Sequence, residues 1–192
     1  MTLNTNGIAS DVAGKRILIT GGASGIGAAS ALLLASRGAK VVIGDMAEEM
    51  GEAVAKQGQD AGNSIVFKKV DVTSGDEVRA LFDFAVETLG GLDVVVNNAG
   101  IDHKPSPMHE LSDDDFDRNI AVNLKGVWHC MRAAVNCMLP NGGGHVINVA
   151  SIAGLRSAPM ISAYSAAKHG VIGLTKSAAL EYVRYGIRIN AV

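Results

Sequence analysis

The chain has 192 residues, of which 48% are hydrophobic and 19% charged, and its formal net charge is −2 at pH 7. This length suits one domain with a substantial core and is short for two, and the composition is that of a globular rather than a disordered protein. A pI of about 6.2 without any basic run argues against nucleic acid or an anionic membrane surface as a partner.

Short apolar segments alternate with helix-forming segments along the chain. This alternation predicts an α/β protein with a parallel sheet covered on both faces. Right-handed crossovers then give a doubly wound, Rossmann-type sheet. Residues 14–192 are expected to form this single domain, after a flexible lead at residues 1–13. The predicted strands are 15–20, 41–45, 65–70, 92–96, 145–149 and 187–192, and the predicted helices are 26–37, 47–59, 74–89, 113–139 and 163–185.

The turn between the first predicted strand and helix is rich in glycine. Residues 20–27 read T-G-G-A-S-G-I-G, a G-x-x-x-G-x-G spacing rather than the common G-x-G-x-x-G. Glycines let the backbone approach a pyrophosphate closely, and the following helix start offers free N–H groups and a positive dipole end. The alternative is a tight strand-to-helix turn without a ligand. The position of the turn, after the first strand, favours the nucleotide-binding interpretation.

Asp45 ends the second predicted strand. In dinucleotide-binding folds an acid about 20 residues beyond the first glycine accepts hydrogen bonds from the adenosine ribose hydroxyls. A carboxylate there also repels a 2′-phosphate, and Ser24 leaves the glycine turn without a basic residue to hold one. Both observations favour NAD(H) over NADP(H). Arg37 is the nearest basic residue, and we expect it to face solvent.

Ser151, Tyr164 and Lys168 form the candidate catalytic group. Ser151 follows a predicted strand, and Tyr164 and Lys168 lie four residues apart on one face of the next helix. An ammonium beside a phenol favours the ionised phenol, which can then exchange a proton with a substrate oxygen. Ser151 is placed to hydrogen-bond the same oxygen. Taken alone, a Tyr-x-x-x-Lys spacing is also typical of an ordinary exposed helix face.

The motifs gain weight from their order. Along nearly its whole length the chain resembles the classical short-chain dehydrogenase/reductase family. The matching motifs are 20–27, Asp45, Asp71-Val72, N-N-A-G at 97–100, Asn123, Ser151, Tyr164-x-x-x-Lys168 and Asn190-Ala191.

The resemblance implies a role for each of these residues. Tyr164 is expected to be the general acid/base, Lys168 to assist it and bind the nicotinamide ribose, Ser151 to hold the substrate oxygen, and Asn123 to anchor a water in a proton relay. Asn123 as an ordinary helix residue and Asp71 as a cap remain alternatives. The expected cofactor contacts are Gly21, Ser24, Gly25, Ile26, Gly27, Asp45, Met46, Asp71, Val72, Asn98, Ala99, Gly100, Tyr164 and Lys168.

The resemblance also implies an activity. We expect an oxidoreductase that transfers a hydride between NAD(H) and a small secondary alcohol or ketone. Relative to the family the chain lacks the C-terminal substrate loop and last strand, so we expect a C-terminally truncated domain whose own activity is open. The alternative is a truncated or non-catalytic NAD-binding or scaffold protein of the same fold. The sequence indicates neither the substrate nor the direction of the reaction.

Two further expectations concern assembly and location. The helices over 116–139 and 163–185 are apolar on more than one face, which predicts a homodimer or homotetramer built through them. Cys130 and Cys137 lie seven residues apart in one predicted helix, too far for a disulfide, and no metal-ligand spacing is present. With no membrane-length apolar run and no leader pattern, we expect a cytoplasmic protein without a metal.

Overall fold

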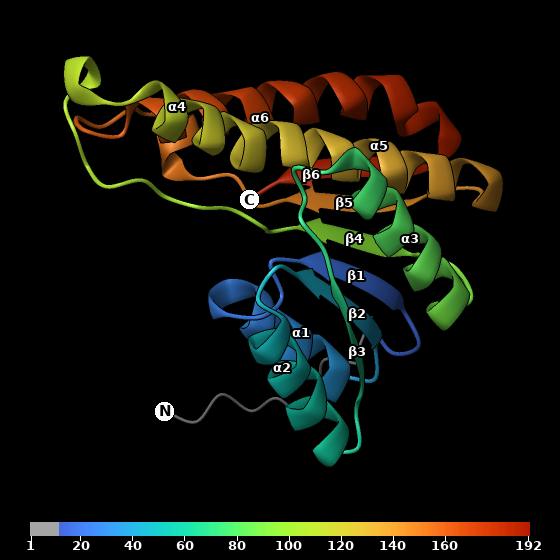
Figure 1. The fold of residues 1–192 in the computed structure, drawn as a ribbon. Helices are drawn as coiled ribbons and strands as arrows, with labels where there is room; N and C mark the ends of the chain where they lie inside the picture. Colours follow the sequence, from blue (N-terminus) through green and yellow to red (C-terminus); the bar gives the residue numbers. More distant parts are fainter. Residues whose placement is uncertain (1–11) are drawn as a thin grey trace, which may run out of the picture.

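The protein is a six-stranded parallel sheet with helices on both faces (Figure 1). The computed structural model describes residues 12–192, so most of the expected flexible lead lies outside the described residues. The strand order is β3-β2-β1-β4-β5-β6. The strands are β1 (Arg16–Thr20), β2 (Lys40–Asp45), β3 (Ser64–Lys69), β4 (Val94–Asn97), β5 (Gly144–Asn148) and β6 (Ile187–Ala191). The predicted doubly wound, Rossmann-type sheet is therefore confirmed.

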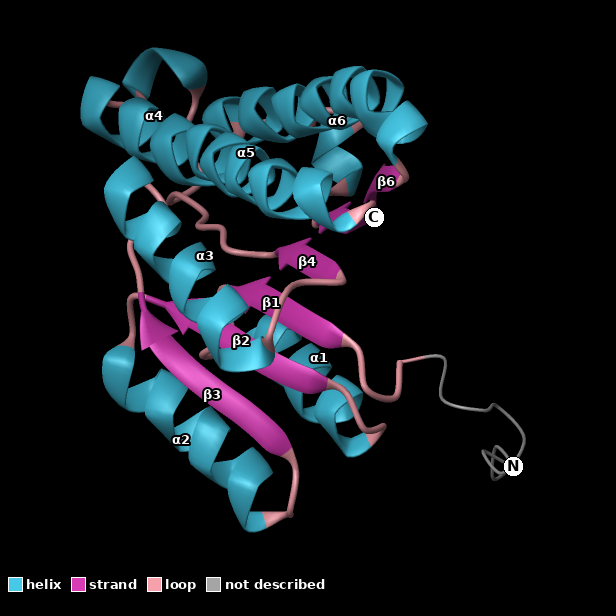
Figure 2. Ribbon diagram, turned by 90° about the vertical axis from the view of Figure 1, so that its right-hand side faces the viewer, coloured by secondary structure: helices cyan, strands magenta, loops and turns pink. Residues whose placement is uncertain are grey.

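The helices lie in two layers. Helices α1 and α2 cover the β1–β3 part of one face, and α3, α5 and α6 cover the other face (Figure 2). The chain runs outward from β1 to β3 and returns to place β4 beside β1. Strand order thus reverses between β1 and β4, which opens a crevice at their carboxyl ends where such folds bind ligands. The helices are α1 (Gly25–Ser36), α2 (Glu48–Asp60), α3 (Gly75–Leu89), α4 (Asp113–Ile120), α5 (Val127–Met138) and α6 (Ser162–Tyr182).

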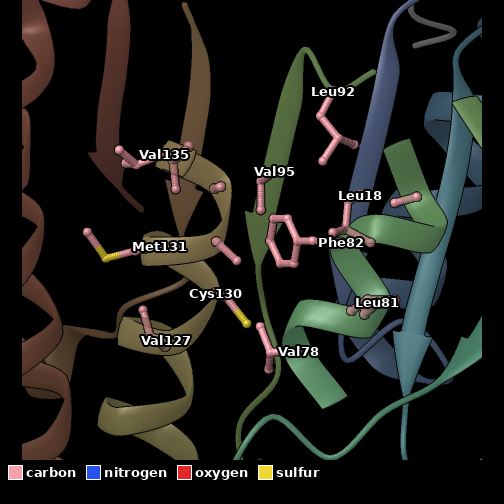
Figure 3. Packing of buried hydrophobic residues seen from close by; sticks show 14 of the residues in the cluster. Leu18, Val78, Leu81, Phe82, Leu92, Val95, Val127, Cys130, Met131 and Val135 are labelled. Atoms are coloured by element: carbon pink, nitrogen blue, oxygen red, sulfur yellow. The ribbon is translucent and has the colours of Figure 1, made fainter. Parts of the chain in front are cut away.

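The larger core fills the space between the sheet and α3, α5 and α6. Phe82 of α3 lies beside Val95 of β4 there, and Cys130 of α5 reaches toward Val78 of α3; all four residues are at most 1% exposed (Figure 3). On the other face α2 packs closely because it carries glycine where the sheet presents bulk: a Cβ at Gly58 would lie 2.5 Å from the end of Ile65. Both cores hold the strand ends, and so the crevice, in fixed positions.

The helix predicted over 113–139 is interrupted. Between α4 and α5 the chain forms a π-helical segment, Ala121–Gly126. The amide of Asn123, within this segment, forms hydrogen bonds with both main-chain groups of Ile101. Single π-helical turns commonly mark functional positions. The wider turn allows Asn123 to reach the loop after β4 while α4 and α5 keep the same general direction.

No helix within residues 12–192 combines the length and the apolar character needed to cross a membrane. Among the same residues, no three His, Cys, Asp or Glu side chains are grouped so that they could hold a metal ion together.

Candidate active site

The glycine turn after β1 owes its shape to close backbone packing. Gly21 has a φ of +67°, and a Cβ there would lie 2.7 Å from Cα of Ala99. A Cβ at Gly22 would lie 2.5 Å from Cβ of Ile43, and one at Gly27 would run into the carbonyl oxygen of Gly21. Because these positions have no side chain, the start of α1 can pack closely against the ends of β1 and β4.

Gly25 differs from these glycines because it faces open space. Its φ is +51°, and a Cβ there would have nothing within 4 Å. Helix α1 begins at this residue, the side chain of Ser24 makes no capping hydrogen bond, and the first turn holds no acidic residue. By contrast, Ser74 caps α3 by accepting from the N–H of Glu77. The N–H groups at the start of α1 are therefore left for an external anion, as a pyrophosphate site requires.

Asp45 is held against the glycine turn. One carboxylate oxygen accepts from the N–H of Ala23 and the other from the N–H of Ala47, each at 3.0 Å. These two bonds fix the orientation of the carboxylate. Each oxygen keeps a lone pair, so the group remains able to accept hydrogen bonds from sugar hydroxyls.

A cavity of about 480 Å³ opens at the carboxyl ends of the strands, beside Asp45. Its walls come from the turns after β1, β2, β3 and β4 and from the start of the π-helical segment. Glycine backbone, an acid and apolar walls lie side by side here, which is the set of groups that a dinucleotide-binding site requires. The lining residues are Gly21, Gly44, Asp45, Met46, Ala47, Val70, Asp71, Val72, Thr73, Ala99, Gly100, Ile101, Arg118, Ala121 and Val122.

Two polar side chains stabilise the turns around this cavity. Asp71 accepts from the N–H and the hydroxyl of Thr73, at 2.9 and 2.8 Å, so it caps the turn after β3 and lines the cavity at the same time. The amide of Asn98 donates to the carbonyl oxygens of Thr20 and Gly21. It thereby joins the turn after β4 to the glycine turn.

Lys168 and Tyr164 lie together on α6, as the spacing predicted. The ammonium Nζ of Lys168 is 5.6 Å from the centre of the Tyr164 ring. It donates to the carbonyl oxygen of Val149, just after β5, at 2.8 Å. The side chain is only 4% exposed, and this burial lowers the pKa of Lys168 from its ordinary value. A cation with a single main-chain acceptor is thus held beside the phenol.

Ser151 lies in the segment that Lys168 anchors. Its hydroxyl accepts from the N–H of Ala153 and caps a short 3₁₀ turn, Ile152–Gly154. Gly154 packs directly on α6: a Cβ there would lie 2.7 Å from the carbonyl oxygen of Lys168. The loop that carries Ser151 is therefore in contact with the helix that carries Tyr164.

Asn123 is fully buried between the two parts of the site. Its Nδ2 donates to the carbonyl oxygen of Ile101 and to the side chain of Asn119, and its Oδ1 accepts from the N–H of Ile101. A Cβ at Gly100 would lie 2.9 Å from that Oδ1 and 3.8 Å from Nζ of Lys168. Gly100 thus lets Asn123 and Lys168 approach each other.

The predicted residues form two adjoining groups. Gly21, Asp45, Met46, Asp71, Val72, Ala99 and Gly100 line the cavity. Ser24, Gly25, Ile26 and Gly27 form the adjoining turn and helix start, and Asn98 braces that turn. Asn123, Ser151, Tyr164 and Lys168 do not line the cavity and lie around the ends of β4 and β5. The two groups meet at Gly100 and Ile101.

Three features escaped the sequence analysis. Arg118 of α4 lines the cavity. The buried ring of His129 lies with Nδ1 3.1 Å from the carbonyl oxygen of Val72, which steadies a cavity wall. Asn148 of β5 is fully buried and bonded to Asn97 and Thr175. For His129 and Asn148 the sequence signal was a polar residue within an apolar segment, whereas Arg118 lies in a polar one and gave no such signal.

Comparisons with known proteins give a consistent result. The family model described as short chain dehydrogenase matches residues 15–192. Cis-4-hydroxycyclohexanecarboxylate dehydrogenase of Sinomonas cyclohexanicum is 49% identical over 91% of this chain and 70% of its own. Cyclohexanol dehydrogenase of Acinetobacter sp. (strain SE19) is 45% identical over 93% of this chain and 71% of its own. A crystal structure of NAD⁺-bound xylitol dehydrogenase superposes with a TM-score of 0.92 at 34% identity, covering 94% of this chain and 70% of that one.

Proposed function

The chain belongs to the short-chain dehydrogenase family, and we propose that it serves as an NAD-dependent oxidoreductase of cyclic secondary alcohols and the corresponding ketones. Membership confirms the resemblance drawn from the motifs. The substrate class is supported by the two relatives named for ring alcohols. The observation that carries the proposal is the meeting of Tyr164 and buried Lys168 with the Ser151 loop, next to an open nucleotide-type crevice.

The glycine turn and Asp45 are the residues that would hold the cofactor. The uncapped start of α1 would take the pyrophosphate, and Asp45 the adenosine ribose. When bound, the nicotinamide supplies hydride chemistry that no side chain can perform. Asp45 supports a preference for NAD(H), because two N–H groups hold its carboxylate where it would repel a 2′-phosphate.

Tyr164 and Lys168 would handle the proton. The phenolate oxygen of Tyr164 would take the proton of a substrate alcohol, and in the reverse direction the phenol would return it to a ketone oxygen, while Ser151 holds that oxygen by a hydrogen bond. Lys168 would place its Nζ beside this group, 5.6 Å from the centre of the Tyr164 ring. Because the amide of Asn123 is committed to Ile101 and Asn119, its part in a proton relay would fall to its main-chain carbonyl in the π-helical segment.

The test is turnover of cyclohexanol and related ring alcohols with NAD, followed by the absorbance of NADH. We expect Tyr164→Phe to lower kcat by about 10²- to 10⁴-fold while NADH affinity is kept. Tyr185→Phe, at an exposed tyrosine beyond the end of α6, is the matched control and should keep full turnover. NADH binding by the unaltered chain without turnover of any alcohol or ketone would favour a non-catalytic NAD-binding protein.

We also propose that the chain assembles as a homodimer or homotetramer through α5 and α6. An apolar groove of about 280 Å³ runs between these helices, with Trp128, Met131 and Leu174 among its lining residues. Arg132 and Glu181 border the same groove, so a second copy related by two-fold symmetry can pair opposite charges across it. Light scattering at micromolar concentration tests this, and a monomer would contradict it.

A cytoplasmic location is the remaining proposal. Both cysteines are free thiols, and burial raises the pKa of Cys130 to about 12. Reduced cysteines of this kind are typical of proteins in a reducing compartment. Cell fractionation with an antibody to the protein tests the location, and recovery in an extracellular fraction would contradict it.

A further inference from the structure

A lysine stands next to Asp45 at the adenosine end of the site. Lys69 is the register partner of Asp45 in the parallel pairing of β2 with β3, and such partners lie about 4.8 Å apart. Both side chains extend from the same face of the sheet. Gly51 of α2 packs against Phe67, two residues before Lys69, so this is the face that α2 covers. A phosphate seated at Asp45 would therefore lie within reach of Lys69.

Lys69 is already engaged by an acid from α2. Its Nζ lies 2.8 Å from Oε2 of Glu48, and this hydrogen bond raises the pKa of Lys69. Glu48 stands in the first turn of α2, directly after the turn that carries Met46 and Ala47. The ammonium is consequently directed along α2 toward Glu48. Both side chains are more than half exposed, so the pair can be broken at low cost in stability.

Acidic side chains also make the start of α2 unfavourable for an external anion. Glu48 and Glu49 both lie in its first turn, where the helix dipole favours negative charge. The start of α1, which would take the pyrophosphate, carries no acid. The two helix starts beside Asp45 thus differ in charge. The start of α1 carries no acid and is open to a phosphate, whereas the start of α2 carries two carboxylates.

We propose that the Glu48–Lys69 ion pair is a second determinant of cofactor choice, which holds Lys69 away from a 2′-phosphate at Asp45 and so disfavours NADP(H). This inference deepens the proposed function and rests on it. Asp45 repels the phosphate directly, whereas Glu48 acts by occupying the cation that would otherwise attract it. The ribose of NAD(H) carries no such phosphate, so the pair leaves NAD(H) affinity unchanged.

Titrations of the full chain with NADH and with NADPH test the pair. Glu48→Gln removes the charge and keeps the shape, and we expect it to lower the Kd for NADPH about three- to fivefold at low salt, with the Kd for NADH unchanged. The same substitution in an Asp45→Asn background should give a gain of at least this size, because the direct repulsion is absent. Asp60→Asn, which breaks the exposed Lys56–Asp60 pair at the far end of α2, is the matched control and should change neither Kd.

A third variant separates the lysine from the simple loss of a negative charge. Adding Lys69→Gln to Glu48→Gln should abolish the NADPH gain. A gain that survives this double substitution, or no gain from Glu48→Gln in either background, overturns the inference while NADH binding still supports the proposed function. An unaltered chain that binds neither nucleotide removes the proposed function itself, and the inference with it.

Discussion

The two halves of the site present their functional groups differently. From β1 to α3 the ligand would meet main-chain N–H groups, shaped by glycines that pack against their neighbours. From β4 to α6 it would meet side chains, those of Ser151, Tyr164 and Lys168, on an anchored loop and helix. The first half therefore depends on the absence of side-chain atoms at its glycines, with Asp45 as a cofactor-binding side chain beside them, whereas the second half depends on side chains. Adding a side chain should therefore be most damaging at the glycines of the first half, and removing a side chain should be most damaging in the second half.

The largest effect is expected where a side chain is added to the glycine half. Gly27→Ala would drive a Cβ into the carbonyl oxygen of Gly21, and the neighbouring amide of Asn98 leaves no room to move. We expect the free energy of unfolding to fall by about 3 kcal/mol or more, because backbone rather than a flexible side chain must shift. Urea denaturation followed by circular dichroism measures this loss.

Gly25→Ala is the matched variant on the same turn. Its Cβ would enter open space, so the only cost in stability is the positive φ, about 1–2 kcal/mol. Its NADH affinity should nevertheless fall, because the added carbon lies where the ligand would approach. Equal loss of stability in the two variants would show that the glycines do not divide into packed and ligand-facing positions.

The next effect comes from removing a side chain in the other half. Lys168→Met keeps the apolar stem but loses the ammonium beside Tyr164 and its bond to Val149. We expect kcat to fall about 10²-fold or more with the fold retained. An unfolded variant, or one with normal turnover, would remove the distinction between the two halves.

The same variant carries a pH signature. Burial lowers the pKa of Lys168 below the 10.5 of an unfolded lysine, so between these two values the unfolded chain binds more protons than the folded one. The free energy of unfolding of the unaltered protein should therefore rise with pH in that range, relative to Lys168→Met. Urea denaturation at pH 7 and pH 10 measures the difference, and parallel behaviour of the two proteins would contradict it.

Much of the fold could be read from the sequence, because alternating strands and helices depend on local pattern. The ends of β1, β2 and β3 lie within one residue of their predicted positions, whereas β4 begins at Val94 instead of Leu92. Leu92 is buried in the core before the strand starts, so its apolar character indicated a buried position and not a strand residue. The π-helical segment was not predictable, since it depends on a contact between Asn123 and Ile101, 22 residues earlier.

The site divides in the same manner. Glycines and Asp45 are recognisable because a turn imposes its own spacing. Arg118, His129 and the Glu48–Lys69 pair were not, because Arg118 reaches the cavity only through helix packing, and the others depend on partners that the fold brings near. The side-chain roles that were predicted, such as those of Tyr164 and Lys168, rested on the resemblance as well as on helical spacing. A single sequence therefore locates short local motifs better than contacts between distant segments.

The smallest effect is expected at the amino ends of the strands, opposite the site. Asp93 precedes β4 at its amino end and accepts two side-chain bonds and one main-chain bond from Arg16. The hydrogen bond from the Arg16 side chain lowers the pKa of Asp93, so the stabilisation is present at pH values above its unfolded pKa and is lost as the pH falls through the folded one. Because both side chains are about one-third exposed, we expect Asp93→Asn to cost about 1 kcal/mol at pH 7 and progressively less on acidification. NADH affinity should stay unchanged, since ligands of this fold bind at the carboxyl ends of the strands. Weaker NADH binding by Asp93→Asn would show that the amino ends of the strands also support the site. The contrast between the two halves would then not account for cofactor binding by itself.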